Sequence, residues 1–219
     1  MLWPAIRRGL HISTKTFREQ VIGAAIGMRA HSGWAVAVAV ARLGQAPRVV
    51  LRKRIELIAE DTPKQPYHAA QSLNLKAAEK LIGHCKETVQ RLAREELGAL
   101  IRELQSRSFT VTGVGVLLAS GRALGTLAQS LASHAAIHTA EGELFRNALI
   151  EAAKHWRLPV VPVKERELFD RSAEKLGRPV DEIRERIKEM GAQLGPPWRM
   201  DEKLSALLAW LVLAERPNT

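Results

Sequence analysis

Histidine and carboxylate side chains gather in the segment 134–143, at positions His134, His138, Glu141 and Glu143. If the segment is helical from its start, His134, His138 and Glu141 stand at i, i+4 and i+7 on one face, which is a workable spacing for a metal ion. If the helix begins at Thr139 instead, with that residue as its cap, Glu141 and Glu143 are first-turn acids that complement the helix dipole. The sequence leaves both interpretations open.

Three further polar residues stand at the ends of predicted elements. His31 lies in the turn after the first predicted strand, and Arg29 just before it could hold a phosphate or a carboxylate through two hydrogen bonds. Asp201 begins the last predicted helix, where an acid also serves simply as a cap or a first-turn residue. Whether these side chains form a site depends on which elements the fold brings together.

Three short strands are predicted near the start of the chain. Val21–Met28 is an apolar run with two glycines, as in a central strand that packs closely against helices. Trp34–Ala41 alternates alanine and valine, and Arg48–Ala59 alternates apolar with charged residues, as an edge strand with one wet face does. Because only short turns join them, the three strands are expected to form an antiparallel meander.

Helices and strands alternate in the rest of the chain. The segment 61–71 is polar with two prolines and predicts a loop, and apolar residues spaced by three and four then predict a long helix from about Leu75 to Ser106. The later elements are a strand at Phe109–Leu118, a helix at Ala140–Trp156, a strand at Leu158–Val163, helices at Glu165–Leu176 and Val180–Leu194, and a last helix at Met200–Ala214. Since helices separate the fourth and fifth strands from those before them, these strands are expected to be parallel.

The chain is strongly basic, with 33 lysines and arginines against 23 acidic residues and a formal net charge of +10. Such a balance favours a polyanion such as DNA or RNA as partner, through phosphate neutralisation and counterion release, although a solvated basic surface is the plain alternative. Part of the excess is local, since residues 1–20 hold four basic residues against Glu19 alone. The segment 42–54 is also basic and contains no acid.

The remaining bulk features concern compartment and organisation. The single Cys85 excludes an internal disulfide and fits a reducing compartment, so we expect a cytoplasmic protein. No apolar run reaches the length of a membrane span, and we expect no membrane partner. Residues 1–20 lack the apolar stretch of a secretory signal and are expected to be a basic flexible tail, or to follow from a start codon placed too far upstream. A single domain is expected over residues 21–214, with a short tail at 215–219.

The order of elements resembles the ribonuclease H-like superfamily, and in particular its Holliday-junction-resolvase-like branch. Three segments carry this resemblance: Ile26–Trp34 resembles the first strand and turn, Glu143–Val163 the helix that leads into a Leu-Pro-Val strand, and Asp201–Ala209 the closing helix. The resemblance implies an α/β fold, with three antiparallel strands and then alternating helices and parallel strands in one mixed sheet.

Nucleases of this family hold divalent metal ions with carboxylates from the first strand, the fourth strand and the last helix, and this sequence departs from that pattern. Arg29 stands where the first-strand aspartate is expected, and a guanidinium cannot be a metal ligand. The fourth strand ends in Ser120-Gly121-Arg122 with no carboxylate nearby. Only Asp201, with Glu202 beside it, matches the family's metal-binding acid.

The resemblance also implies that Arg29, His31, Ser120 and Asp201 converge at one end of the sheet. Arg29 could bind a phosphate there. Alternatively, it could neutralise Asp201 or Glu141 across the former metal site, as a cation that replaces a lost metal.

Three hypotheses about function follow. The leading hypothesis is a degenerate domain that binds nucleic acid or a protein partner without cleavage, with nucleic-acid contacts from Arg29, Arg52, Arg54 and Arg122. The alternative is a nuclease dependent on Mg²⁺ or Mn²⁺ with a rearranged site. Its catalytic residues would be His31, Glu141, Glu143 and Asp201, and its metal ligands His138, Glu141 and Asp201. A third hypothesis is a scaffold in which the long helix mediates formation of a homodimer.

Overall fold

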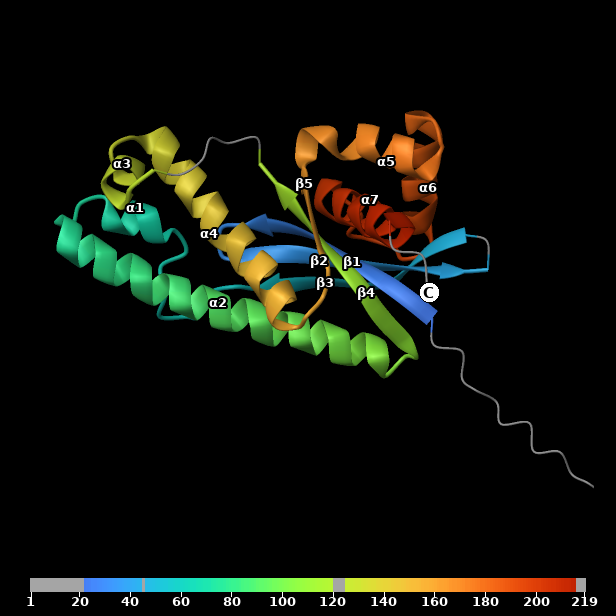
Figure 1. Ribbon diagram of the computed structural model, residues 1–219, viewed down its shortest axis with the longest axis horizontal. Helices are drawn as coiled ribbons and strands as arrows, with labels where there is room; N and C mark the ends of the chain where they lie inside the picture. The colour runs from blue at the N-terminus through green and yellow to red at the C-terminus, as the bar shows by residue number, and fades with distance from the viewer. Residues whose placement is uncertain (1–21, 45, 120–124, 216–219) are drawn as a thin grey trace, which may run out of the picture.

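The computed structural model describes residues 22–44, 46–119 and 125–215. At its centre lies one mixed sheet (Figure 1), whose strands are β1 Ile22–His31, β2 Trp34–Leu43, β3 Ala46–Glu56, β4 Phe109–Leu118 and β5 Val160–Lys164. The strand order is β3-β2-β1-β4-β5. β2 pairs antiparallel with β1 and β3, whereas β4 runs parallel to β1 and β5 runs parallel to β4. The predicted meander followed by parallel strands is confirmed.

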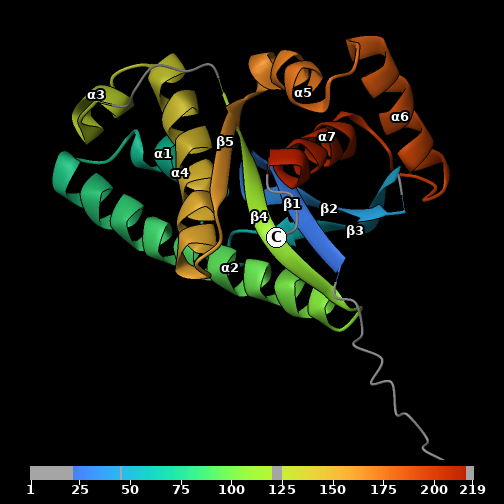
Figure 2. The ribbon, with the colours of Figure 1, turned by 45° about the vertical axis from the view of Figure 1, so that its right-hand side comes forward.

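Two long helices cover one face of the sheet (Figure 2): α2 (Leu75–Gln105) and α4 (His134–His155). Their apolar sides meet the strand residues that point to this face, so that Leu97 of α2, Phe145 of α4 and Met28 of β1 are fully buried in one core. The predicted long helix is therefore confirmed almost to its ends, and its apolar stripe faces the sheet as the spacing requires.

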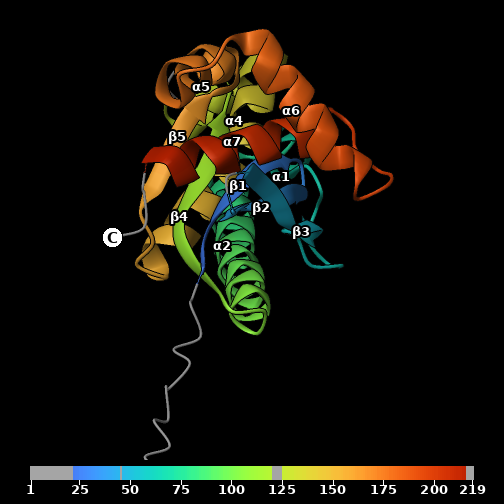
Figure 3. The same ribbon diagram turned by 90° about the vertical axis from the view of Figure 1, so that its right-hand side faces the viewer.

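The opposite face carries α7 (Met200–Glu215), with α5 (Leu168–Leu176) and α6 (Val180–Ala192) outside it (Figure 3). A short 3-10 turn, η1 (Glu165–Glu167), joins β5 to α5. Almost every residue of α7 from Leu204 to Leu213 is buried. A helix that is apolar all round must be covered all round, and α7 meets this requirement because it lies between the sheet and two further helices.

Glycines on the central strands let α7 approach the sheet backbone. A Cβ placed on Gly27 of β1 would lie 2.7 Å from the backbone nitrogen of Ala209, and one on Gly115 of β4 would lie 2.9 Å from Leu208 Cδ1. Both distances are too short for a side chain to fit, so these positions require glycine for the close approach. The middle of α7 is thereby packed closely against β1 and β4.

The structure corrects the sequence prediction at two places that matter for the candidate site. The segment 61–71, predicted as a loop, contains the short helix α1 (Pro66–Ala70), which has proline at its first position. The helix predicted from Ala140 begins at His134, because the Ser133 side chain accepts a hydrogen bond from the backbone N–H of Ala136. Thr139 is therefore not the cap, and its hydroxyl donates to the carbonyl of the preceding turn.

Several predictions fall outside the described residues, namely the basic tail 1–20, Ser120 and Arg122. A short helix, α3 (Leu127–Leu131), precedes α4. Among the residues that the structure describes, no helix combines the length and the apolar character needed to cross a membrane.

Candidate functional site

The alternation of β1 determines which of its side chains meet α7. Ile26 and Met28 point to the α2 and α4 face, so Gly27, Arg29 and His31 point to the α7 face. His31 is the last residue of β1 rather than part of the turn, and it pairs across the hairpin with Trp34. The carboxyl end of β1 therefore presents a guanidinium and an imidazole toward the start of α7.

Arg29 forms ion pairs with two carboxylates from other elements. Its Nη1 donates to Asp201 Oδ1 in the first turn of α7, and its Nε and Nη2 donate to Glu165 Oε2 and Oε1 at 3.1 Å and 3.3 Å. Partial burial lowers the pKa of Arg29, but the hydrogen bonds and charges of Glu165 and Asp201 outweigh that effect and raise the pKa above its usual value. The guanidinium thus remains charged and occupies three carboxylate oxygens.

An aromatic stack extends this group toward β3. His31 Nε2 lies 3.1 Å from Asp201 Oδ1, and the imidazole stacks on Trp34 with ring centroids 4.2 Å apart and 13° between the planes. The guanidinium of Arg54 lies 4.1 Å from the centroid of a Trp34 ring, which is a cation–π contact. We refer to these side chains together as the Arg29 cluster: Arg29, His31, Trp34, Arg54, Glu165 and Asp201.

Glu202, next to Asp201, has a structural role. Its side chain is buried, and Oε2 accepts a hydrogen bond of 2.7 Å from the backbone N–H of Arg199, just before α7 begins. Glu202 thus satisfies an open donor at the helix start, as a capping acid does. This leaves the carboxylate of Asp201 available to Arg29 and His31.

The predicted nucleic-acid contacts on β3 are engaged within the chain and partly exposed. Arg52 donates to the carbonyl of Gly195 at 2.9 Å and to that of Pro197, and so it holds the loop that leads into α7. Arg54 pairs with Glu56 at 2.7 Å, and the Arg54 side chain keeps 56% of its surface exposed. Of these two, only Arg54 belongs to the Arg29 cluster, and its guanidinium is open to a ligand.

A second group of titratable side chains, the histidine cluster, lies on the other face of the sheet. It consists of His68 on α1 and His134 and His138 on α4, and one ring nitrogen from each lies within 4.8 Å of the others. His134 Nε2 and His138 Nε2 are 2.9 Å apart. The sequence indicated the two helical histidines but not His68, because His68 is about seventy positions away from them along the chain.

Glu141 contacts the histidine cluster through His68. Its Oε1 accepts hydrogen bonds from the backbone N–H groups of Tyr67 and His68 at 2.9 Å and 3.1 Å and lies 3.2 Å from His68 Nδ1. Its Oε2 is buried and has no hydrogen-bond partner in the part of the chain that the structure describes. Burial raises the pKa of Glu141, although the hydrogen bonds from His68 and Tyr67 lower it in part.

The structure therefore places the five residues of the hypothetical rearranged nuclease site in separate regions of the molecule. His31 and Asp201 belong to the Arg29 cluster on the α7 face, whereas His138 and Glu141 lie at the start of α4 on the opposite face. Glu143 pairs with Arg146 at 3.0 Å on the same helix. Arg29 neutralises Asp201 and not Glu141.

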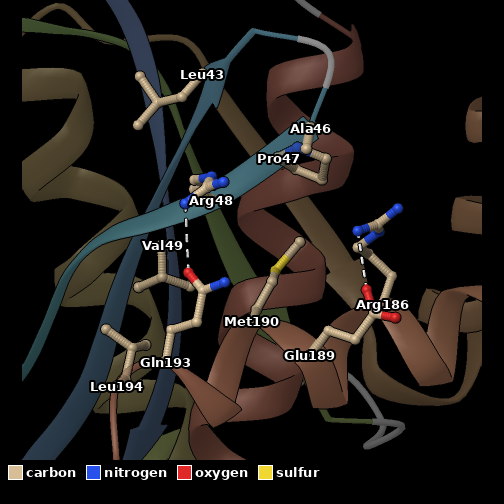
Figure 4. A pocket seen from close by; sticks show the side chains of 10 residues that line it. All are labelled: Leu43, Ala46, Pro47, Arg48, Val49, Arg186, Glu189, Met190, Gln193 and Leu194. Carbon is tan, nitrogen blue, oxygen red and sulfur yellow. Dashed lines mark hydrogen bonds and ion pairs between the residues drawn. The ribbon is translucent and has the colours of Figure 1, made fainter.

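A surface cavity of about 320 Å³ lies between the start of β3 and α6, next to the β2–β3 turn (Figure 4). Its charged groups already have partners, since Arg48 donates to Gln193 Oε1 and Arg186 pairs with Glu189. The rest of its lining is largely apolar, with Met190 at its floor. No residue of the Arg29 cluster or the histidine cluster lines this cavity.

Comparison with known proteins gives a likeness in structure only. No protein-family model matches the sequence, and no curated protein matches it. Among solved structures, Thermus thermophilus RuvC matches with a TM-score of 0.50 at 12% identity, over 87% of this chain and 93% of that one. The structure of T. thermophilus RuvC in complex with a Holliday junction substrate matches with a TM-score of 0.50 at 11% identity, over 86% and 91% of the two chains. The likeness extends over most of both chains and confirms that this chain has the ribonuclease H-like fold.

Proposed function

We propose that this chain is a ribonuclease H-like domain that binds nucleic acid without cleaving it. One observation carries the second half of the proposal: Arg29 forms ion pairs with Asp201 and Glu165 at the carboxyl end of β1. A magnesium ion needs oxygen ligands at about 2.0–2.1 Å. Three of the four carboxylate oxygens of Asp201 and Glu165 already accept hydrogen bonds from Arg29, so a metal could bind there only if the guanidinium left.

The charge of the chain and its structural neighbours support the first half of the proposal. The net charge of +10 favours a polyanion as partner, and one of the similar RuvC structures contains a Holliday junction substrate. Within the Arg29 cluster, Arg54 offers an exposed guanidinium stacked on Trp34. Such a group can pair with a phosphate while its flat face stays on the indole. The nucleic acid is therefore proposed to lie along β3 and the carboxyl end of β1.

Fluorescence anisotropy with labelled four-way junction, duplex and single-stranded DNA, measured over a series of salt concentrations, tests the proposal. We expect binding that weakens steeply as salt rises, and we expect Arg54→Ala to weaken it and to lower the salt slope by about one. Arg91→Ala is the matched control, because Arg91 is a similarly exposed arginine in an ion pair on α2, on the other face. Equal effects of the two substitutions, or no binding of any of the three DNA forms, would contradict the proposal.

A further inference from the structure

We infer that the histidine cluster binds a divalent transition-metal ion of the zinc class, at a site separate from the Arg29 cluster. In a tetrahedral zinc site with Zn–N bonds of about 2.0–2.1 Å, neighbouring ligand nitrogens are about 3.3 Å apart. The nitrogens of His68, His134 and His138 are separated by distances from 2.9 Å to at most 4.8 Å, which bracket this value. The three nitrogens are thus close enough together for one ion to be proposed between them.

The secondary structure places these histidines so that few side-chain adjustments are needed. His134 and His138 are one turn apart on α4, so their rings project from the same side of the helix, with centroids 4.3 Å apart. His68 comes from α1 and meets both rings edge-on, at 5.4 Å and 4.8 Å between centroids. The ion would therefore link two elements that are far apart in the sequence.

Glu141 behind His68 completes an arrangement that metal sites commonly use. A histidine ligand usually donates its other ring N–H to a carboxylate, which selects the tautomer and orients the ring. Here Glu141 Oε1 lies 3.2 Å from His68 Nδ1, which leaves Nε2 as the nitrogen that can bind an ion. The backbone N–H groups of Tyr67 and His68 hold the carboxylate in this position.

The buried, unpartnered oxygen of Glu141 is a second and independent observation. Glu141 is only 2% exposed, and its Oε2 has no hydrogen-bond partner among the described residues. A buried carboxylate with one unsatisfied oxygen costs folding free energy. A divalent ion on His68 would place positive charge near this carboxylate and so offset the free-energy cost of burying it.

The ligand atoms select the ion. Imidazole nitrogens favour zinc, copper and nickel, whereas magnesium and calcium prefer oxygen ligands. His134 and His138 are exposed, so the fourth position of a tetrahedral ion faces solvent and would hold a water molecule or an anion. The site thus has three protein ligands and one open position, on the other face of the sheet from the Arg29 cluster.

Isothermal titration of chelator-treated protein with zinc chloride tests the inference, and visible absorption with cobalt reports the coordination geometry. We expect one zinc ion per chain and the intense absorption of four-coordinate cobalt. His134→Ala and His138→Ala should each weaken zinc binding at least 100-fold, and Glu141→Gln should weaken it 10- to 100-fold. His155→Ala is the control, because His155 is an exposed histidine at the other end of α4 and should have no effect.

The exposed histidines can be replaced without disturbing the core, so thermal melts of the chelated variants are expected to match those of the chelated wild type. Zinc binding to the wild type that is no tighter than binding to His138→Ala would overturn the inference. An equal loss of zinc affinity in His155→Ala would also overturn it. Neither result depends on nucleic-acid binding, so a failure of this inference is distinguishable from a failure of the proposed function.

Discussion

Replacing Arg29 by alanine removes the only cation that pairs with Asp201 and Glu165 in the described part of the chain. Two carboxylates from different elements are then left facing the same space, with His31 as the remaining polar neighbour of Asp201. Because α7 is held against β1 by close packing at Gly27, the first turn of the helix cannot easily move away. We therefore expect Arg29→Ala to destabilise the fold and to create affinity for a divalent cation at this position.

The loss of stability in Arg29→Ala can be worked from the exposure of the Arg29–Asp201 pair. The side chains of Arg29 and Asp201 are 24% and 23% exposed, between the limits of a surface pair and a buried one. Surface pairs contribute up to about 1 kcal/mol and breaking a buried pair costs about 3–5 kcal/mol, so the substitution should cost about 2 kcal/mol. In a chain of this size that lowers Tm by about 4–8 °C. If magnesium binds the freed carboxylates with a Kd of about 1 mM, about 10 mM magnesium should restore about 1.4 kcal/mol.

Urea denaturation followed by circular dichroism, with and without magnesium, measures both quantities. Arg91→Ala is the control for loss of an exposed ion pair and should change the free energy of unfolding by less than about 0.5 kcal/mol. We expect magnesium to stabilise Arg29→Ala more than the wild type. Equal stabilisation of the two proteins by magnesium, or an Arg29→Ala variant as stable as the wild type, would refute the reasoning.

Two further predictions concern packing and the buried acid. Gly27→Ala should lower the free energy of unfolding, measured by urea denaturation, by about 3 kcal/mol, because its Cβ would meet the α7 backbone at Ala209. Gly83→Ala on the open surface of α2 is the control and should be neutral or stabilising by up to about 1 kcal/mol. Equal effects of the two substitutions would show that α7 does not pack closely on β1. With metal chelated, Glu141→Gln should be at least as stable as the wild type, because the substitution removes a buried negative charge, and saturating zinc should reverse that order in thermal melts. A chelated Glu141→Gln variant that melts well below the wild type would show that the carboxylate stabilises the fold without a metal.

Much of the fold could be predicted because its elements have strong periodic patterns. The strand at Phe109–Leu118 and the helix from Leu75 agree with the structure almost to the residue, since an apolar run between turns and a one-sided stripe are local signals. The start of α4 could not be decided from the sequence, because Ser133 and Thr139 are both capable caps, and the structure uses Ser133. α1 was missed because five residues carry too little pattern to distinguish a helix from a loop.

The candidate sites show the same division between local and long-range information. The pairing of Arg29 with Asp201 could be anticipated from the resemblance, which places the first strand beside the last helix. Glu165 was not anticipated, because its approach depends on how the turn after β5 lies against β1. His68 was missed for the same reason, since only the packing of α1 on α4 brings it to His138. A proline at the first position of a short helical segment was the one local signal that could have indicated α1.

The most direct test of the central claim is an assay of binding and cleavage on the same labelled four-way junction, in magnesium and in manganese. We expect the wild-type chain to shift the junction in a salt-dependent manner and to leave its strands intact with either metal. We expect Asp201→Asn to leave the junction uncleaved and to change the salt dependence of binding little, because the Asp201 carboxylate already pairs with Arg29. Metal-dependent nicking by the wild type that disappears in Asp201→Asn would contradict the account.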